Sequence, residues 1–189
     1  MDAVAAAFEA IPREGFLPRR SRWRASYDGP IQIGRGQTNS QPRTVADMLR
    51  LLEVRPGDRV LDVGAGSGWT TALLAHLVGP EGRVLGVELE PELAAWGAAN
   101  VAATGQTWAS IEPARPRTLG MPDRAPFERI LVSAEARVLP DELVHQLVTD
   151  PADPGRMVVP VAGEMVLVVC SGDDLEVTFH GYYRFVPLR

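Results

Sequence analysis

Cysteine and histidine are scarce in this chain. Of its 189 residues one is a cysteine, Cys170, and three are histidines, at positions 76, 145 and 180. A single cysteine can form neither an internal disulfide nor a cysteine metal cluster. The histidines lie far apart in the sequence, and none forms the close pair that a zinc peptidase helix carries. The sequence therefore predicts no metal site and offers no cysteine-histidine pair for nucleophilic catalysis.

Long apolar runs and a surplus of positive charge are also missing. No stretch approaches the ~18 apolar residues of a membrane-spanning helix, and Asp2 stands where a secretory signal would carry positive charge. We therefore expect a cytoplasmic protein without membrane contact. The net charge of -5 argues against nucleic acid as a partner. The arginines between residues 13 and 24 are interpreted as a solvated face or a contact for a small anionic peptide. The sequence does not fix the oligomeric state, and a monomer is the simplest expectation.

The remaining composition is that of an ordinary globular chain, with 46% hydrophobic and 23% charged residues. Strand-like and helical patterns alternate, which predicts an α/β fold with a doubly wound, mostly parallel sheet and helices on both faces. Apolar runs around the polar stretch 171–174 predict an antiparallel hairpin at the C-terminal edge. We expect a single domain, in which residues 1–57 form an N-terminal helix, arm and lid, and residues 58–189 form the core.

Periodicity and helix-start signals place the individual elements. Helices are expected over residues 2–10, 42–52, 69–78, 91–104 and 140–148. Strands are expected over residues 60–63, 84–88, 125–134, 156–161, 164–170 and 175–179. The sequence between residues 13 and 35 has no regular pattern and contains prolines and several glycines. We expect it to be an extended arm laid over the domain.

The stretch Arg59–Gly68, which reads Arg-Val-Leu-Asp-Val-Gly-Ala-Gly-Ser-Gly, organises the chain. Its apolar run suits a buried strand, and its glycines let a ligand approach the backbone where the next helix starts. The spacing excludes a dinucleotide fingerprint, because Trp69 stands at the position of the third glycine. No Lys-Ser or Lys-Thr pair follows, which excludes a Walker loop. Ala65 stands two residues before Ser67, where a nucleophile elbow needs glycine.

Two acids flank this turn. Asp62 lies two residues before the first glycine, and Glu88 ends the next expected strand, where it can accept hydrogen bonds from both hydroxyls of a ribose. The combination resembles the S-adenosylmethionine site of class I methyltransferases and implies a Rossmann-like fold. A plain glycine-rich turn beside a solvated Glu88 is the alternative. The resemblance implies a cofactor site that includes Asp62, Gly64, Ala65, Gly66, Ser67, Gly68, Glu88 and Leu89.

Further motifs narrow the resemblance. They are Ile-Pro-Arg-Glu at 11–14, Tyr-Asp-Gly at 27–29, Gly-Gln-Thr-Asn-Ser-Gln-Pro at 36–42 and Arg-Phe-Val-Pro-Leu at 184–188. Together with the glycine turn they resemble the protein-L-isoaspartate O-methyltransferases over nearly the whole chain. The resemblance implies that isoaspartyl and D-aspartyl carboxylates of damaged peptides and proteins are methylated for repair. It also implies that Gln37, Thr38, Asn39 and Ser40 form a segment that covers the cofactor. By the same resemblance, Ser40 is the active-site serine of this segment. Ser40 can equally be read as the N-cap of the helix that Pro42 begins.

The chain departs from that family at two places. Asn39 stands where the family usually has an apolar residue, and Arg115-Pro116-Arg117 occupies the region of a Gly-Asp-Gly whose acid holds the adenine amino group. The adenine role could pass to Glu112 or to backbone groups, or cofactor affinity could be reduced. Two alternatives therefore stay open: a methyltransferase of another carboxylate or peptide substrate, and a non-catalytic module of the same fold.

The chemistry of the acceptor agrees with the scarcity of histidine and cysteine. A carboxyl group of ordinary pKa near ~4 is ionised at neutral pH. Its methylation therefore needs no general base, whereas an amine or carbon acceptor must lose a proton. In this interpretation Ser40 orients the carboxylate and does not attack.

Overall fold

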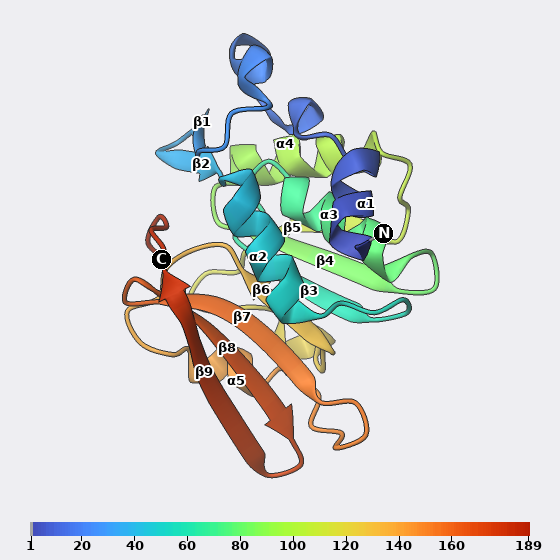
Figure 1. The fold of residues 1–189 in the computed structure, drawn as a ribbon, viewed down its shortest axis with the longest axis vertical. Helices are drawn as coiled ribbons and strands as arrows, with labels where there is room; N and C mark the ends of the chain where they lie inside the picture. Colours follow the sequence, from blue (N-terminus) through green and yellow to red (C-terminus); the bar gives the residue numbers. More distant parts are fainter. Residues whose placement is uncertain (1) are drawn as a thin grey trace.

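The computed structural model describes residues 2–189, which are built on a seven-stranded sheet (Figure 1). The strands lie in the order β5-β4-β3-β6-β7-β8-β9. Pairing is parallel from β5 to β7 and antiparallel from β7 through β8 to β9. The expected mostly parallel sheet with an antiparallel C-terminal edge is confirmed. The bounds are β3 (Arg59–Val63), β4 (Arg83–Glu88), β5 (Ala109–Pro113), β6 (Arg129–Val132), β7 (Gly155–Val161), β8 (Glu164–Ser171) and β9 (Asp174–Tyr182).

The strand order reverses at β3, which has β4 on one side and β6 on the other. The connections that leave these strands therefore diverge and leave room between them. In open α/β sheets, ligands bind outside the carboxyl ends of the strands at such a point. The glycine turn at residues 64–68 follows β3 and lies at this position.

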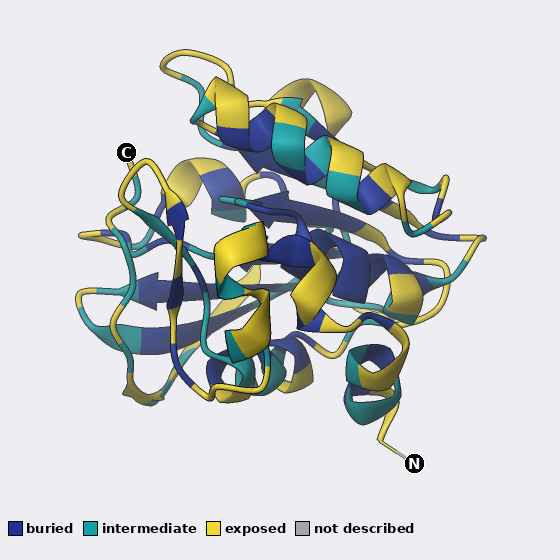
Figure 2. Ribbon diagram, turned by 90° about the horizontal axis from the view of Figure 1, so that it is seen from above, coloured by how far each residue is buried: buried dark blue, intermediate teal, exposed yellow. Residues whose placement is uncertain are grey.

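The helices cover the two faces of the sheet unequally (Figures 1 and 2). On one face, four helices pack into a common core that includes Met48, Leu73 and Ala94. On the other face only the short α5 and nearby loops add side chains, among them Leu143 and Phe127. The helix bounds are α1 (Ala3–Ala10), α2 (Pro42–Leu52), α3 (Trp69–Val78), α4 (Pro91–Ala102) and α5 (Asp141–Val144).

Helix α2 shows how local sequence sets an element. Pro42 occupies its first turn, where a missing N–H is harmless, and Glu53 ends it in the left-handed conformation. Its expected apolar face is buried, and this face carries the helix onto the sheet beside β6 and β7. The buried apolar side chains of α2 are Val45, Met48, Leu49 and Leu52.

The arm between residues 13 and 35 is more regular than expected, and the prediction of an extended arm was wrong for residues 13–24. It contains two 3-10 helices, η1 (Arg13–Phe16) and η2 (Arg19–Arg24), followed by β1 (Ile31–Gly34). Strand β1 pairs antiparallel with β2 (Gln37–Asn39) through a turn whose residues have positive φ. Ile33 packs towards Gly66 of the glycine turn, so a contact distant in sequence holds this small sheet in place.

Two expected elements are shorter in the structure. The helix expected over residues 140–148 ends at Val144, because the chain then pairs with Phe127. The Phe127 N–H donates to the Gln146 carbonyl at 2.8 Å, and the Val148 N–H donates to the Phe127 carbonyl at 2.9 Å. The strand expected over residues 125–134 keeps regular pairing only as β6. The 171–174 hairpin turn between β8 and β9 is confirmed.

Candidate functional site

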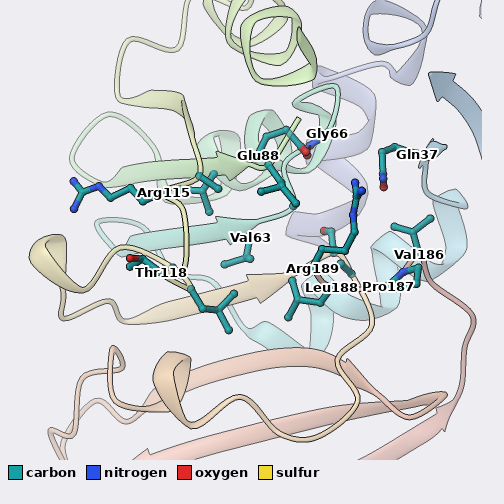
Figure 3. A pocket seen from close by; sticks show the side chains of 18 of the residues that line it. Gln37, Val63, Gly66, Glu88, Arg115, Thr118, Val186, Pro187, Leu188 and Arg189 are labelled. Atoms are coloured by element: carbon teal, nitrogen blue, oxygen red, sulfur yellow. Dashed lines mark hydrogen bonds between the residues drawn. The ribbon is translucent and has the colours of Figure 1, made fainter. Parts of the chain in front are cut away.

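A cavity of about 440 Å³ opens at the carboxyl ends of the parallel strands (Figure 3). Its walls come from the ends of β3, β4 and β6, the loop after β5, strand β2 and the end of the chain. The structure thus brings together segments that are far apart in the sequence. Six of the predicted cofactor residues line this cavity: Gln37, Thr38, Gly64, Gly66, Glu88 and Leu89.

The glycines of the turn have different roles. All three have positive φ, which disfavours any side chain. Gly64 and Gly66 line the cavity, so their backbone is open to a ligand. Gly68 does not line it; a Cβ there would lie 2.8 Å from the Gly97 carbonyl oxygen on α4. Gly68 is therefore required for the packing of α4 against the turn.

The Glu88 carboxylate is fixed at the end of β4. Its Oε2 accepts from the Gly66 N–H at 2.8 Å, and its Oε1 accepts from the Glu90 N–H at 2.9 Å. Each oxygen keeps a further lone pair, and the residue still lines the cavity. Glu88 and Gly66 lie together in Figure 3, so the carboxyl ends of β3 and β4 present one polar surface.

Asp62 lies behind the turn and not in the cavity. It is fully buried, and its Oδ2 accepts from the hydroxyls of Thr70 and Thr71 at 2.8 and 2.7 Å. Burial raises the pKa of the carboxyl to about 6, against the lowering effect of these hydroxyls. Asp62 therefore fixes the first turn of α3, and any effect on a ligand is indirect.

Asn39 joins the lid to the glycine turn. Its Nδ2 donates to Ser67 Oγ at 3.1 Å, and its Oδ1 accepts from Arg13 Nε at 2.6 Å. Arg13 also donates to the Asn39 and Ser40 carbonyls at 3.0 and 2.8 Å. Burial lowers the pKa of this guanidinium to about 10, so it stays charged at neutral pH. Arg13 belongs to the arginines interpreted from the sequence as a solvated face, and for Arg13 that interpretation was wrong, because its side chain is buried at this contact.

Ser40 lies beside the cavity, in a surface groove of about 500 Å³. Together with Asn39, Ala65 and Ser67, it also lines a cavity of about 30 Å³ at the glycine turn, here called the connecting cavity. The alternative that Ser40 is the N-cap of α2 was wrong: the cap position is Gln41. The first turn is instead held by Asp28, which accepts from the Arg43 N–H at 3.1 Å.

The end of the cavity beyond β5 has an unexpected lining. Glu112, one candidate for the adenine contact, does not line the cavity, whereas Arg115, Pro116 and Arg117 do. Arg115 makes a two-point ion pair with Asp123 at 2.8 and 2.9 Å. Apart from Glu88, the acidic side chain that lines the cavity among residues 2–189 is Glu142 of α5. No spacing in the sequence pointed to it, because α5 reaches the cavity only through the tertiary fold.

The end of the chain forms another wall. The Glu135 N–H donates to the Val186 carbonyl, and the Leu188 N–H donates to the Glu135 carbonyl, each at 2.8 Å. Arg189 pairs with Glu90 at 2.7 Å. The side chains from Val186 to Arg189 surround the cavity on the side of Gln37 (Figure 3).

Comparison with known proteins decides the family. A family model described as Protein-L-isoaspartate(D-aspartate) O-methyltransferase (PCMT) matches residues 1–189. The chain belongs to this family. A curated PCMT relative, the protein-L-isoaspartate O-methyltransferase of Methanopyrus kandleri, is 44% identical over 98% of this chain and 82% of its own. That of Methanocella arvoryzae is 40% identical over 95% of both chains.

Solved structures agree with the PCMT fold. A protein-L-isoaspartate O-methyltransferase structure matches with a TM-score of 0.85 and 25% identity, over the whole of this chain and 62% of the other. A putative enzyme of this kind from Plasmodium falciparum, in complex with S-adenosyl-L-homocysteine, matches with a TM-score of 0.83 and 23% identity, over the whole of this chain and 91% of its own. The fold is the Rossmann-like fold of class I methyltransferases.

As a PCMT, the chain is an S-adenosylmethionine-dependent protein carboxyl O-methyltransferase. The residues present fit this cofactor, because the cavity offers an open glycine backbone and a fixed carboxylate at the next strand end. Among residues 2–189, no three metal-ligating side chains gather into a possible metal site. None of the helices described is long and apolar enough to cross a bilayer.

Proposed function

We propose that this PCMT methylates isoaspartyl and D-aspartyl carboxylates in damaged proteins, as a cytoplasmic monomer of one domain without nucleic-acid or membrane partners. One observation carries the proposal: the cavity that suits the cofactor meets the surface groove beside Ser40, at Thr38 and Ser133. A bound methyl donor and an acceptor in the groove would therefore face each other across these residues. Residues 1–57 supply the groove and the lid, and residues 58–189 supply most of the cavity.

The cofactor would be held by the predicted residues in distinct ways. Glu88 would accept from the ribose hydroxyls, beside Leu89, and the open backbone of Gly64 and Gly66 allows close approach. Gln37, Thr38 and Asn39 would cover the cofactor from β2. Ala65 and Ser67 shape the turn, and Asp62 and Gly68 support it from behind.

The adenine would lie at the far end of the cavity, where Thr118 and Glu142 contribute polar atoms. The Glu142 carboxylate can accept a hydrogen bond from the exocyclic amino group of the adenine. It would thereby take the role of the acid in the Gly-Asp-Gly motif, which this chain lacks. This assignment replaces the role considered for Glu112.

The chemistry requires positioning and no proton transfer. S-adenosylmethionine supplies an electrophilic methyl group on sulfur when bound. An acceptor carboxylate with a pKa near ~4 is already ionised, so the chain must hold one of its oxygens ~3 to 3.5 Å from the methyl carbon. Ser40 would donate a hydrogen bond to that carboxylate and would keep its proton.

The groove suits a peptide whose neighbours vary. Its walls mix polar, aromatic and charged side chains of both signs, including Asp47 and Arg184. No single charge dominates it, so recognition would rest on the isoaspartyl carboxylate and backbone groups and less on flanking side chains.

Methyl transfer to a matched pair of peptides tests this proposal. One peptide carries isoaspartate at a single position, and its twin carries normal aspartate there. We expect transfer to the first and at least 100-fold less to the second, since the twin places its carboxylate one carbon away from the reactive position. Equal transfer would favour a methyltransferase of another carboxylate, and a lack of cofactor binding in calorimetry would favour a non-catalytic module.

A further inference from the structure

The hydroxyl of Ser133 is an anomaly in the described part of the chain. Its Oγ is buried, yet it has no hydrogen-bond partner. Buried polar side-chain atoms are almost always paired, and an unpaired one lowers stability. A hydroxyl kept in such a state is a candidate for binding a ligand.

The position of Ser133 is set by the fold. It follows β6, and its N–H donates to the Val63 carbonyl at 2.8 Å, which holds it against the end of β3. A Cβ on Gly64 would lie 3.8 Å from the Ser133 Cβ, so the residue stands beside the first glycine of the turn. The switch point between β3 and β6 therefore places Ser133 at the cofactor site.

Ser133 also stands where the hollows meet. The cofactor cavity, the surface groove and the small connecting cavity share two lining residues in the described chain, Thr38 and Ser133. Ser40 lines the groove and the connecting cavity. An acceptor that reaches from the groove towards the cofactor passes these three residues.

The connecting cavity carries no charged side chain among the residues described as lining it. A carboxylate that enters such a place loses hydration and needs donors. An arginine would supply them but would also neutralise the attacking anion, whereas neutral hydroxyls orient it and leave its charge to react with the sulfonium.

We propose that Ser133 is a second catalytic hydroxyl, which acts with Ser40 on the acceptor carboxylate. This rests on the proposed function. One carboxylate oxygen attacks the methyl carbon, a carbon–oxygen bond forms, and the carbon–sulfur bond breaks with its electron pair passing to sulfur. Ser133 donates to the other oxygen and retains its proton, so the products are the methyl ester and the thioether.

The test is Ser133→Ala, with four measurements: kcat/KM on the isoaspartyl peptide, cofactor Kd, Tm without ligands, and circular dichroism. The loss of a hydrogen bond to a charged acceptor predicts a roughly 10- to 100-fold fall in kcat/KM. Cofactor Kd should change less than about twofold. Tm should stay level or rise, because an unpaired buried hydroxyl is removed.

Four comparison variants sharpen the test. Ser133→Thr keeps a hydroxyl and should recover much of the activity. Ser110→Ala removes an exposed serine on β5 and should leave every value unchanged. Ser40→Ala and the double variant should show non-additive losses, because both hydroxyls serve one carboxylate.

The outcomes separate the two proposals. A wild-type enzyme that fails on the isoaspartyl peptide overturns the proposed function itself. An active wild type with an equally active Ser133→Ala overturns only the role of Ser133. A fall in Tm, or weaker cofactor binding that accounts for the lost rate, would also overturn it and assign the hydroxyl a structural or cofactor role.

Discussion

Asp62 and Glu88 are acids at the ends of neighbouring strands, yet their surroundings differ. Glu88 faces the cavity with both oxygens held by backbone N–H groups, whereas Asp62 is enclosed behind the glycine turn with one oxygen unpaired in the described chain. Their sequence context suggested one shared role in cofactor binding. The structure supports direct contact for Glu88 and a supporting role for Asp62, and each role has its own measurable consequence.

The Glu88→Ala variant should weaken cofactor binding at least tenfold, because the carboxylate is the group that would accept from the ribose. Calorimetric Kd for S-adenosylmethionine measures this directly. Glu112→Ala is a matched control, since Glu112 is an acid on the adjacent strand that does not line the cavity. An unaltered Kd for Glu88→Ala would remove Glu88 from the ribose site, and a weaker Kd for Glu112→Ala would restore its adenine role.

Asp62 should make stability depend on pH. Burial raises its folded pKa from 3.8 to about 6, so the folded state binds the proton more tightly than the unfolded state. The stability that protonated Asp62 contributes to the folded state is fully present below pH 4 and is lost as pH rises through 6. The shift corresponds to an effect on the order of 3 kcal/mol. The asparagine of the Asp62→Asn variant does not titrate between pH 4 and 7. The free energy of unfolding of wild type should therefore fall relative to that of the variant as pH rises over this range.

Denaturant unfolding at several pH values, without cofactor, measures that difference. The prediction is contradicted if the free energies of unfolding of Asp62→Asn and wild type differ by the same amount at every pH between 4 and 7. Such a result would mean that folding does not raise the pKa of Asp62, against the direction that its burial indicates.

At the scale of elements, the lid formed by β1 and β2 is tied to the glycine turn by polar contacts. Asn39 connects Arg13 on one side with Ser67 on the other. These contacts couple the segment proposed to cover the cofactor to the turn proposed to bind it. A loosened lid should therefore affect both stability and turnover.

Asn39→Leu tests this coupling. It removes both side-chain hydrogen bonds and leaves Arg13 Nε buried without that acceptor, which should cost about 2 to 4 kcal/mol. Ser67→Ala removes only the Asn39–Ser67 bond and should cost about 1 kcal/mol. Denaturant unfolding and cofactor Kd on both variants check the order. Equal effects would show that Arg13 contributes nothing to the lid through Asn39.

At the scale of the whole molecule, the sequence predicted what depends on local pattern. The central strand, the glycine turn, helix α2 and the terminal hairpin each have a periodicity or a turn signal of their own. The fold class followed from these elements, and the family resemblance followed from the glycine turn together with the motifs at residues 11–14, 27–29, 36–42 and 184–188. Both are confirmed. The assigned cofactor and catalytic roles of single residues stay predictions.

What the sequence did not predict depends on contacts between distant segments. The β1–β2 sheet is held by Ile33 against the glycine turn, and α5 stops where the chain pairs with Phe127. Arg13 and Glu142 reach the site only through the tertiary fold. No local pattern marks Glu142, and the Ile-Pro-Arg-Glu motif that contains Arg13 does not reveal its partners, which lie 14 to 27 positions away.

Residues 186–189 line the cavity proposed for the methyl donor, with Arg189 held by Glu90. An affinity tag fused after Arg189 would therefore be anchored at the mouth of the cavity. Titrations and rates measured on such a fusion would report the tag as well as the enzyme. Quantitative work accordingly calls for a protein that carries no tag after Arg189.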